Sequence, residues 1–195
     1  RFFERYSISR ADCVLCVTHY LEEYARRFGA RAVETIYNRV YASQFASTRS
    51  SFHHPPVILS VGRLDPPKDQ ACLIRALRGL DAQLLLVGDG VNRGALEQLA
   101  RAEGVGDRVH FAGSVPHRQI QEYYRRADVF AMASFYEGFC IPLLEAMAAG
   151  LPVVASSTDP FPEILGGVGI VVGHEPAAFH QAIAGLLADP VAAME

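Results

Sequence analysis

The chain has 195 residues, of which 50% are hydrophobic and 20% charged, and these proportions are typical of a globular protein that buries a full core. Its net charge of −3 argues against nucleic acid as a partner, because nucleic-acid-binding proteins normally carry a strong basic field. No apolar run approaches the roughly 20 residues of a membrane-spanning helix, and four cysteines do not make a disulfide framework in a chain of this length, so we expect a cytoplasmic protein.

The first quarter of the chain predicts three short elements and a linker. Cys13–Val17 is typical of a buried strand, Tyr20–Phe28 of a helix that stops before a glycine, and Val33–Tyr37 of a second strand. Residues 38–56 mix polar and aromatic side chains and end in His-His-Pro-Pro, so we expect them to form a linker.

From residue 57 onward, short apolar strands alternate with helices. The predicted strands are Val57–Val61, Gln83–Val87, Val109–Phe111, Val129–Met132, Val153–Ala155 and Ile170–Val172. The predicted helices are Gln70–Arg78, Gly94–Glu103, Arg118–Arg126, Pro142–Ala149, Pro162–Leu165 and Ala177–Leu187. This alternation predicts an α/β fold with a doubly wound, parallel, six-stranded sheet. Ligands of such sheets bind at the carboxyl ends of the strands.

Two glutamates flank a predicted helix start in Glu137-Gly-Phe-Cys-Ile-Pro-Leu-Leu-Glu145. Gly138 allows close approach of a ligand to the backbone, and Pro142 suits the first helical position. The helix start offers the unpaired amides of Phe139, Cys140 and Ile141, which attract anions. Carboxylates accept hydrogen bonds from the vicinal hydroxyls of sugars, so the pattern indicates hydroxyl recognition around an anion site. Two ordinary surface glutamates are the alternative.

Arg63 and Lys68 follow the strand at residues 57–61. Lys68 is the only lysine of the chain, since every other member of the 18 Lys and Arg residues is an arginine. An Arg fork together with a Lys point charge suits a diphosphate. The alternative is a solvated lysine and an arginine paired with Asp65 or Asp69.

Taken together and in this order, the motifs of residues 57–188 resemble family 4 (group 1) glycosyltransferases. The matching stretches are Val61-Gly62-Arg63-Leu64…Lys68-Asp69, Leu86-Val87-Gly88-Asp89-Gly90, Val109-His110-Phe111-Ala112-Gly113, Ala127-Asp128-Val129-Phe130, Glu137–Ala155, Pro162-Glu163-Ile164 and Gly169-Ile170-Val171-Val172. The resemblance implies the Rossmann-like, donor-binding half of a GT-B fold. It divides the chain into two parts. Residues 1–50 would be the end of an amino-terminal acceptor domain plus the linker, and residues 51–195 would be the nucleotide-sugar-binding domain.

The resemblance also implies roles for individual residues. Arg63 and Lys68 would hold the diphosphate, Glu137 would contact the donor sugar, and these three are the expected catalytic residues. Glu145 would accept the ribose hydroxyls, and the loop at 113–115 would flank the base. The expected donor-binding residues are Gly62, Gly113, Ser114, Val115, Gly138, Phe139, Cys140, Ile141, Leu144 and Glu145. At Cys140 the family usually has glycine.

Family 4 enzymes transfer a sugar from a nucleotide diphosphate sugar, with retention of anomeric configuration and usually without a catalytic metal or cofactor. The resemblance therefore implies a nucleotide sugar and a sugar or lipid-linked acceptor as partners. The resemblance also implies that nearly all of the first domain lies outside this chain, and we expect the chain alone to be inactive without it. Members of the family are cytoplasmic or peripheral at the inner face of the membrane.

Two other functions remain open at this point. The chain could be a non-catalytic nucleotide-sugar-binding module or subunit. A nicotinamide oxidoreductase is suggested by Gly88-Asp-Gly90 with Gly94, but the spacing is one residue too long and follows the second main strand. Cys13-x-x-Cys16 does not indicate a metal site, because strand residues three apart face opposite sides.

Overall fold

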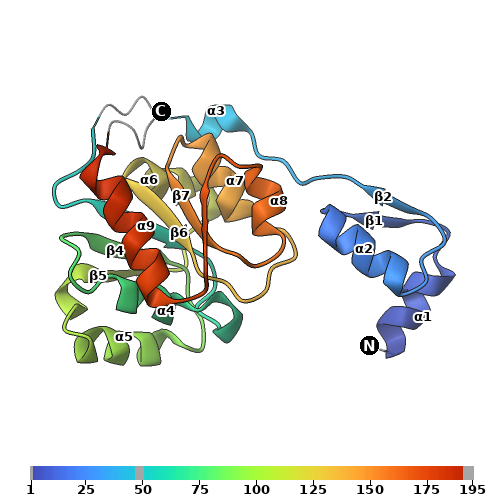
Figure 1. Ribbon diagram of the computed structural model, residues 1–195, viewed down its shortest axis with the longest axis horizontal. Helices are drawn as coiled ribbons and strands as arrows, with labels where there is room; N and C mark the ends of the chain where they lie inside the picture. The colour runs from blue at the N-terminus through green and yellow to red at the C-terminus, as the bar shows by residue number, and fades with distance from the viewer. Residues whose placement is uncertain (1, 47–50, 191–195) are drawn as a thin grey trace.

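The computed structural model describes residues 2–46 and 51–190, so the part of the predicted linker at 47–50 lies outside the described residues. A small part contains helices α1 (Phe2–Arg10) and α2 (His19–Arg27) and a parallel pair of strands, β1 (Val14–Cys16) and β2 (Val33–Thr35). A larger part contains a six-stranded sheet covered by helices, and an extended segment after β2 joins the two parts (Figure 1). Within the described ranges, no helix is long and apolar enough to cross a bilayer.

The six-stranded sheet has the order β5-β4-β3-β6-β7-β8, and all of its pairings are parallel. Its strands are β3 (Val57–Val61), β4 (Gln83–Val87), β5 (Val109–Gly113), β6 (Val129–Met132), β7 (Val153–Ser156) and β8 (Ile170–Val172). The chain winds outward from β3 to one edge and then from β6 to the other. The predicted doubly wound fold is confirmed, and its topological switch point lies between β3 and β6, where such sheets bind ligands.

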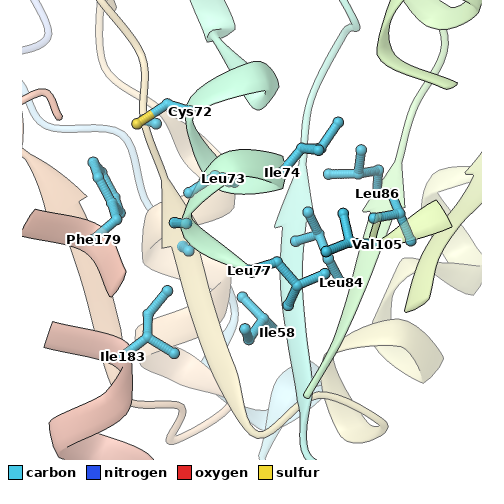
Figure 2. Packing of buried hydrophobic residues seen from close by; sticks show 14 of the residues in the cluster. Ile58, Cys72, Leu73, Ile74, Leu77, Leu84, Leu86, Val105, Phe179 and Ile183 are labelled. Carbon is cyan, nitrogen blue, oxygen red and sulfur yellow. The ribbon is translucent and has the colours of Figure 1, made fainter. Parts of the chain in front are cut away.

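Helices cover both faces of this sheet because successive strand residues point to opposite sides. On one face, Ile58 of β3 packs with α4 (Gln70–Ala76), α5 (Arg93–Ala102) and α9 (Pro176–Ala188); Figure 2 shows this cluster. On the other face, Leu59 packs with α3 (Ala42–Phe45), α6 (Ile120–Arg125), α7 (Ile141–Ala148) and α8 (Phe161–Leu165). Each face therefore has its own apolar core.

The predicted linker contains an element that the sequence did not indicate. Helix α3 lies within residues 38–56, and its Phe45 is 2% exposed. The Phe45 ring packs edge-on against Tyr124, with 5.5 Å between ring centroids. A four-residue helix carries too little periodicity to be recognised, so the anchoring role of Phe45 was missed.

Gly88 allows the loops that follow β3 and β4 to touch. A Cβ atom built on Gly88 would lie 2.0 Å from the carbonyl oxygen of Gly62, and the φ of Gly88 is 135°. The amide of Gly88 also donates to the carbonyl of Gly113, at 2.9 Å, which connects the end of β5 to the same place. The glycines after β4 therefore serve close packing of backbones, and not the dinucleotide fingerprint that their spacing resembles.

Gly88→Ala is expected to lower the free energy of unfolding by about 3 kcal/mol or more, because the methyl group overlaps a backbone oxygen and the φ disfavours any side chain. Gly94→Ala is the matched control, since Gly94 is exposed in α5 and a Cβ there meets nothing within 4 Å. That substitution should stabilise the helix by up to about 1 kcal/mol. Urea unfolding measures the free energy of unfolding of both variants. A Gly88→Ala protein as stable as the parent would contradict the close contact between Gly88 and Gly62.

Glu163 of α8 connects the small part to the large one. Its carboxylate accepts hydrogen bonds from the amides of His19, at 2.7 Å, and Tyr20, at 3.1 Å, at the start of α2, and from the hydroxyl of Tyr37. Burial alone would raise the pKa of Glu163, but these hydrogen bonds outweigh it and lower the pKa. The hydrogen bond to Glu163 raises the pKa of Tyr37 to about 12. Glu163 thus caps a helix of the other part.

Glu163→Gln is expected to lower the opening free energy of the His19 and Tyr20 amides by about 1 to 2 kcal/mol at neutral pH, as measured by hydrogen exchange. Because folding lowers the pKa of Glu163, its stabilisation is complete above the ordinary carboxyl pKa of about 4.3 and is lost as pH falls through the folded value. The difference in the opening free energy of these amides between the parent protein and Glu163→Gln should therefore shrink on acidification.

Glu23→Gln is the control for this experiment, because Glu23 lies on α2 and is an exposed carboxylate paired only with its neighbour Arg27 among the described contacts. It should leave both amides unchanged. Equal exchange rates in Glu163→Gln and the parent protein would show that Glu163 does not cap α2.

Candidate functional site

Lys68 and Glu137 meet where β3 and β6 end. Lys68 ends a 3-10 turn at Pro66–Lys68, and the amide of Phe135 donates to the carbonyl of Pro67, at 2.8 Å. This hydrogen bond ties the loop after β3 to the loop after β6. The ammonium of Lys68 forms an ion pair with Glu137 Oε1, which also accepts from the Ser134 hydroxyl at 2.9 Å. The sequence prediction placed both residues at the same edge of the sheet, and the structure brings them into contact.

This ion pair is largely removed from solvent, since the side chains of Lys68 and Glu137 are 21% and 9% exposed. An ammonium group has three donors, so Lys68 can donate to Glu137 and still bind an anion. Glu137 in turn holds the flexible lysine chain in one position. The pair therefore combines a fixed positive charge with a carboxylate that can accept hydrogen bonds.

Arg63 is the second residue after β3 and lies in the same loop as Lys68, but its side chain points into solvent. It is 79% exposed, and its described ion pair joins Nη1 to Asp65 Oδ2 at 2.9 Å. This is the pairing that the sequence left as an alternative, and an exposed pair of this kind contributes little stability. The preceding Gly62 donates its amide to the carbonyl of Val87, at 2.9 Å, and so fixes the start of the loop.

Helix α7 begins beside Glu137, at Ile141, one residue earlier than predicted, so Pro142 is its second residue. Its N-cap residue is Cys140, with a φ of 79°, in the left-handed region that favours glycine. This conformation explains why a glycine is expected there. Burial raises the pKa of the Cys140 thiol to about 12, so the group is a neutral, packed side chain and not a nucleophile.

The other predicted residues of this segment differ in accessibility. Phe139 is 6% exposed and its ring lies edge-on to that of Tyr37, Gly138 and Leu144 are partly buried, and Ile141 is 44% exposed. The backbone around Gly138 and the side chain of Ile141 are therefore the parts of this segment that a ligand can reach.

Glu145 lies one turn into α7 and faces a cavity of about 340 Å³. Its side chain is 4% exposed, and its Oε2 accepts a hydrogen bond from the Tyr124 hydroxyl at 2.7 Å. Burial raises the pKa of Tyr124, which keeps the phenol protonated as a donor. The cavity is lined by Val61, Val115, His117, Ile120, Ile141, Pro142 and Glu145. A largely apolar cavity with one oriented carboxylate suits a flat ring attached to a polyhydroxyl group.

The loop after β5 contributes to the wall of this cavity. Gly113 ends β5 and pairs with Gly88, Ser114 is exposed, and Val115 lines the cavity. His117 was missed by the sequence prediction, although it lies only two residues beyond this loop segment. Its Nδ1 is 3.9 Å from Glu145 Oε1. Tyr124 was also missed, because a tyrosine in a helix gives no signal that it orients a distant carboxylate.

Comparison with known proteins gives consistent matches. The sequence model of the family described as "Glycosyl transferases group 1" matches residues 44–195. A "GDP-mannose-dependent alpha-(1-6)-phosphatidylinositol monomannoside mannosyltransferase" from Mycolicibacterium smegmatis is 34% identical over 92% of this chain and 54% of its own length. A "Phosphatidyl-myo-inositol mannosyltransferase" from Mycobacterium leprae is 37% identical over 88% of this chain and 50% of its own length.

A solved structure of similar fold is sucrose-phosphate synthase from Thermosynechococcus elongatus. It superposes with a TM-score of 0.87 at 30% identity and covers 99% of this chain and 53% of that protein. The chain therefore spans about half the length of the relatives and of the solved protein that it matches.

Proposed function

Because this chain belongs to the group 1 glycosyl transferases, we propose that it is the donor-binding half of an enzyme that transfers a sugar from a nucleotide diphosphate sugar to an acceptor hydroxyl, with retention of configuration. Residues 51–195 bind the donor, and residues 1–50 are the end of an acceptor domain and the linker. The two mannosyltransferases named above cover this chain almost fully, which supports a hexose as the transferred group.

The observation that carries this proposal is the meeting of Lys68, Glu137 and the start of α7 at the topological switch point. A pyrophosphate placed there receives a positive charge from Lys68 and peptide amides from the helix start. The carboxylate of Glu137 is then beside the sugar attached to that pyrophosphate. Arg63 is free to swing from Asp65 toward the phosphates, because its side chain is in solvent.

The nucleoside occupies the cavity beside Glu145 in this proposal. The carboxylate of Glu145 accepts the two ribose hydroxyls, and the hydrogen bond from Tyr124 leaves Oε1 available for them. The base contacts Val115, in the loop after β5, and Ile141, the first residue of α7, because both residues line the cavity. A cavity of about 340 Å³ is within the range of roughly 300 to 1,000 Å³ typical of small-molecule sites.

Catalysis then depends on stabilising the departing nucleoside diphosphate. Negative charge grows on the pyrophosphate as the bond to the sugar breaks, and in this proposal Lys68 and the amides at the start of α7 stabilise that charge. An interaction that is stronger in the transition state than in the bound donor speeds the reaction, whereas uniform binding does not. The departing phosphate oxygen is the base that accepts the acceptor's proton.

A thermal-shift panel of nucleoside diphosphates, nucleotide sugars and nicotinamide dinucleotides tests the proposal. A ligand that binds only the native state, at 100 times its dissociation constant, stabilises the protein by about 2.7 kcal/mol. We expect one nucleoside diphosphate and its sugar conjugates to raise the melting temperature. Stabilisation by nicotinamide dinucleotides alone, or by no nucleotide, would contradict the proposal.

A further inference from the structure

Three side chains of metal-binding type gather beside the turn that carries Lys68. They are Asp69, Cys72 and His174, and their ligand atoms all lie within 4.8 Å of one another. Asp69 is the N-cap residue of α4, and Cys72 lies in the first turn of that helix. His174 lies in the loop between β8 and α9, more than 100 residues away along the chain.

The fold explains why these distant residues meet. Helices α4 and α9 pack against each other on one face of the sheet, where Cys72, Leu73 and Phe179 belong to the same buried cluster (Figure 2). Asp69 and Cys72 are three residues apart, a spacing that puts both side chains on one side of a helix start. The imidazole of His174 is held above them by stacking on Phe135, with 3.7 Å between ring centroids and 15° between planes.

We propose that Asp69, Cys72 and His174 form a binding site for a divalent transition-metal ion of the zinc type. Sulfur, nitrogen and oxygen ligands together favour Zn²⁺ over Mg²⁺ or Ca²⁺, which prefer oxygen alone. Zn²⁺ holds such ligands at about 2.0 to 2.3 Å, which places the ligand atoms of a tetrahedral ion about 3.3 to 3.8 Å apart. A separation near the 4.8 Å limit of this cluster therefore has to shrink by roughly 1 Å, whereas His174 Nε2 and Asp69 Oδ2, at 2.8 Å, have to move slightly apart. The fourth position is open to water, because Asp69 and His174 are about one-fifth exposed.

The imidazole of His174 turns its Nε2 toward Asp69. Its Nε2 is 2.8 Å from Asp69 Oδ2, while its Nδ1 is buried and has no hydrogen-bond partner among the residues that the structure describes. An ion bound by Nε2 takes the place of the proton between Nε2 and Asp69 Oδ2, and the neutral ring then carries its proton on Nδ1. The ion replaces the thiol proton of Cys72, which leaves to water, and no electron is transferred.

The position of the site gives the ion a structural role. Asp69 follows Lys68 directly, and Phe135, which stacks on His174, donates its amide to Pro67. An ion held by the three residues therefore fastens the β8–α9 loop and the β6–α7 loop to the turn that carries Lys68. It takes no part in the chemistry of glycosyl transfer, and the inference is independent of the proposed function.

Titration of the complete, chelator-treated protein with Co²⁺ tests the inference. A cobalt ion bound to a thiolate absorbs in the near ultraviolet, and tetrahedral cobalt absorbs strongly in the visible. We expect one Co²⁺ per chain, both absorptions, and displacement of Co²⁺ by Zn²⁺. His174→Gln should weaken Co²⁺ binding at least tenfold, and Cys72→Ser should abolish the thiolate band.

Cys13→Ser is the matched control, because Cys13 is an exposed thiol outside the cluster, and it should change nothing. Circular dichroism verifies the folding of each variant. If Cys72→Ser does not fold, the partly exposed His174 still decides the question. Either of two results would overturn the site: no thiolate band in the parent protein, or Co²⁺ binding of equal strength in His174→Gln.

Discussion

Lys68→Ala is expected to lower the turnover of the complete enzyme by about 100-fold or more, while the dissociation constant of the nucleoside diphosphate rises less than tenfold. Removal of a single oriented donor from a transition-state site typically costs this much in rate. The ground-state diphosphate keeps the amides at the start of α7, so its binding is less affected. Steady-state kinetics gives the turnover, and calorimetry on the same preparation gives the dissociation constant.

The ion pair with Glu137 complicates this substitution and supplies its control. Lys68→Ala leaves a carboxylate that is only 9% exposed without its partner, which by itself destabilises the fold. The double variant Lys68→Ala/Glu137→Gln removes that unpaired charge and should regain stability, so the free energies of unfolding of the two variants measure this cost. Its turnover is not a readout for Lys68, because Glu137 is itself an expected catalytic residue. Losses in binding and in turnover of equal size would show that Lys68 only holds the substrate.

Glu145→Ala is expected to raise the dissociation constant of the nucleoside diphosphate at least tenfold, or about 1.4 kcal/mol. The buried carboxylate is oriented by Tyr124 and lines the cavity, so its loss removes the acceptors for both ribose hydroxyls. The effect should be much smaller for a nucleotide analogue without these hydroxyls. Isothermal calorimetry with the two ligands provides the comparison.

Tyr124→Phe separates recognition from packing at this position. It removes the hydrogen bond that orients Glu145 but retains the carboxylate and the ring that packs against Phe45. We expect a loss of nucleotide affinity of only a few fold. Unchanged affinity in Glu145→Ala would reject the assignment of the ribose to this carboxylate.

The sheet could be predicted from the sequence because each strand is a short apolar run bounded by a turn, and right-handed crossovers leave few topologies. The same reasoning placed Lys68 and Glu137 at one edge of the sheet. It could not predict their ion pair, because that contact depends on the hydrogen bond between Phe135 and Pro67 across two loops. The roles of the 13 residues assigned to the site stay predictions.

Other features of the site lay beyond any local pattern. The left-handed backbone at Cys140 is set by the turn into α7 and not by the residue itself, which would normally avoid it. His117 and Tyr124 face Glu145 only because α6 and α7 pack on the same face of the sheet. Asp69, Cys72 and His174 are brought together by the packing of α9 on α4. These two helices are about 100 residues apart in the sequence, so no local pattern links them.

A crystal structure of the complete protein with a bound nucleoside diphosphate tests the account most directly. We expect the pyrophosphate within hydrogen-bond distance of Lys68 and the amides at the start of α7, and the ribose hydroxyls on Glu145. A diphosphate bound elsewhere, for instance in the cavity of about 390 Å³ that is lined by Arg93 of α5 and Phe111 of β5, would contradict it.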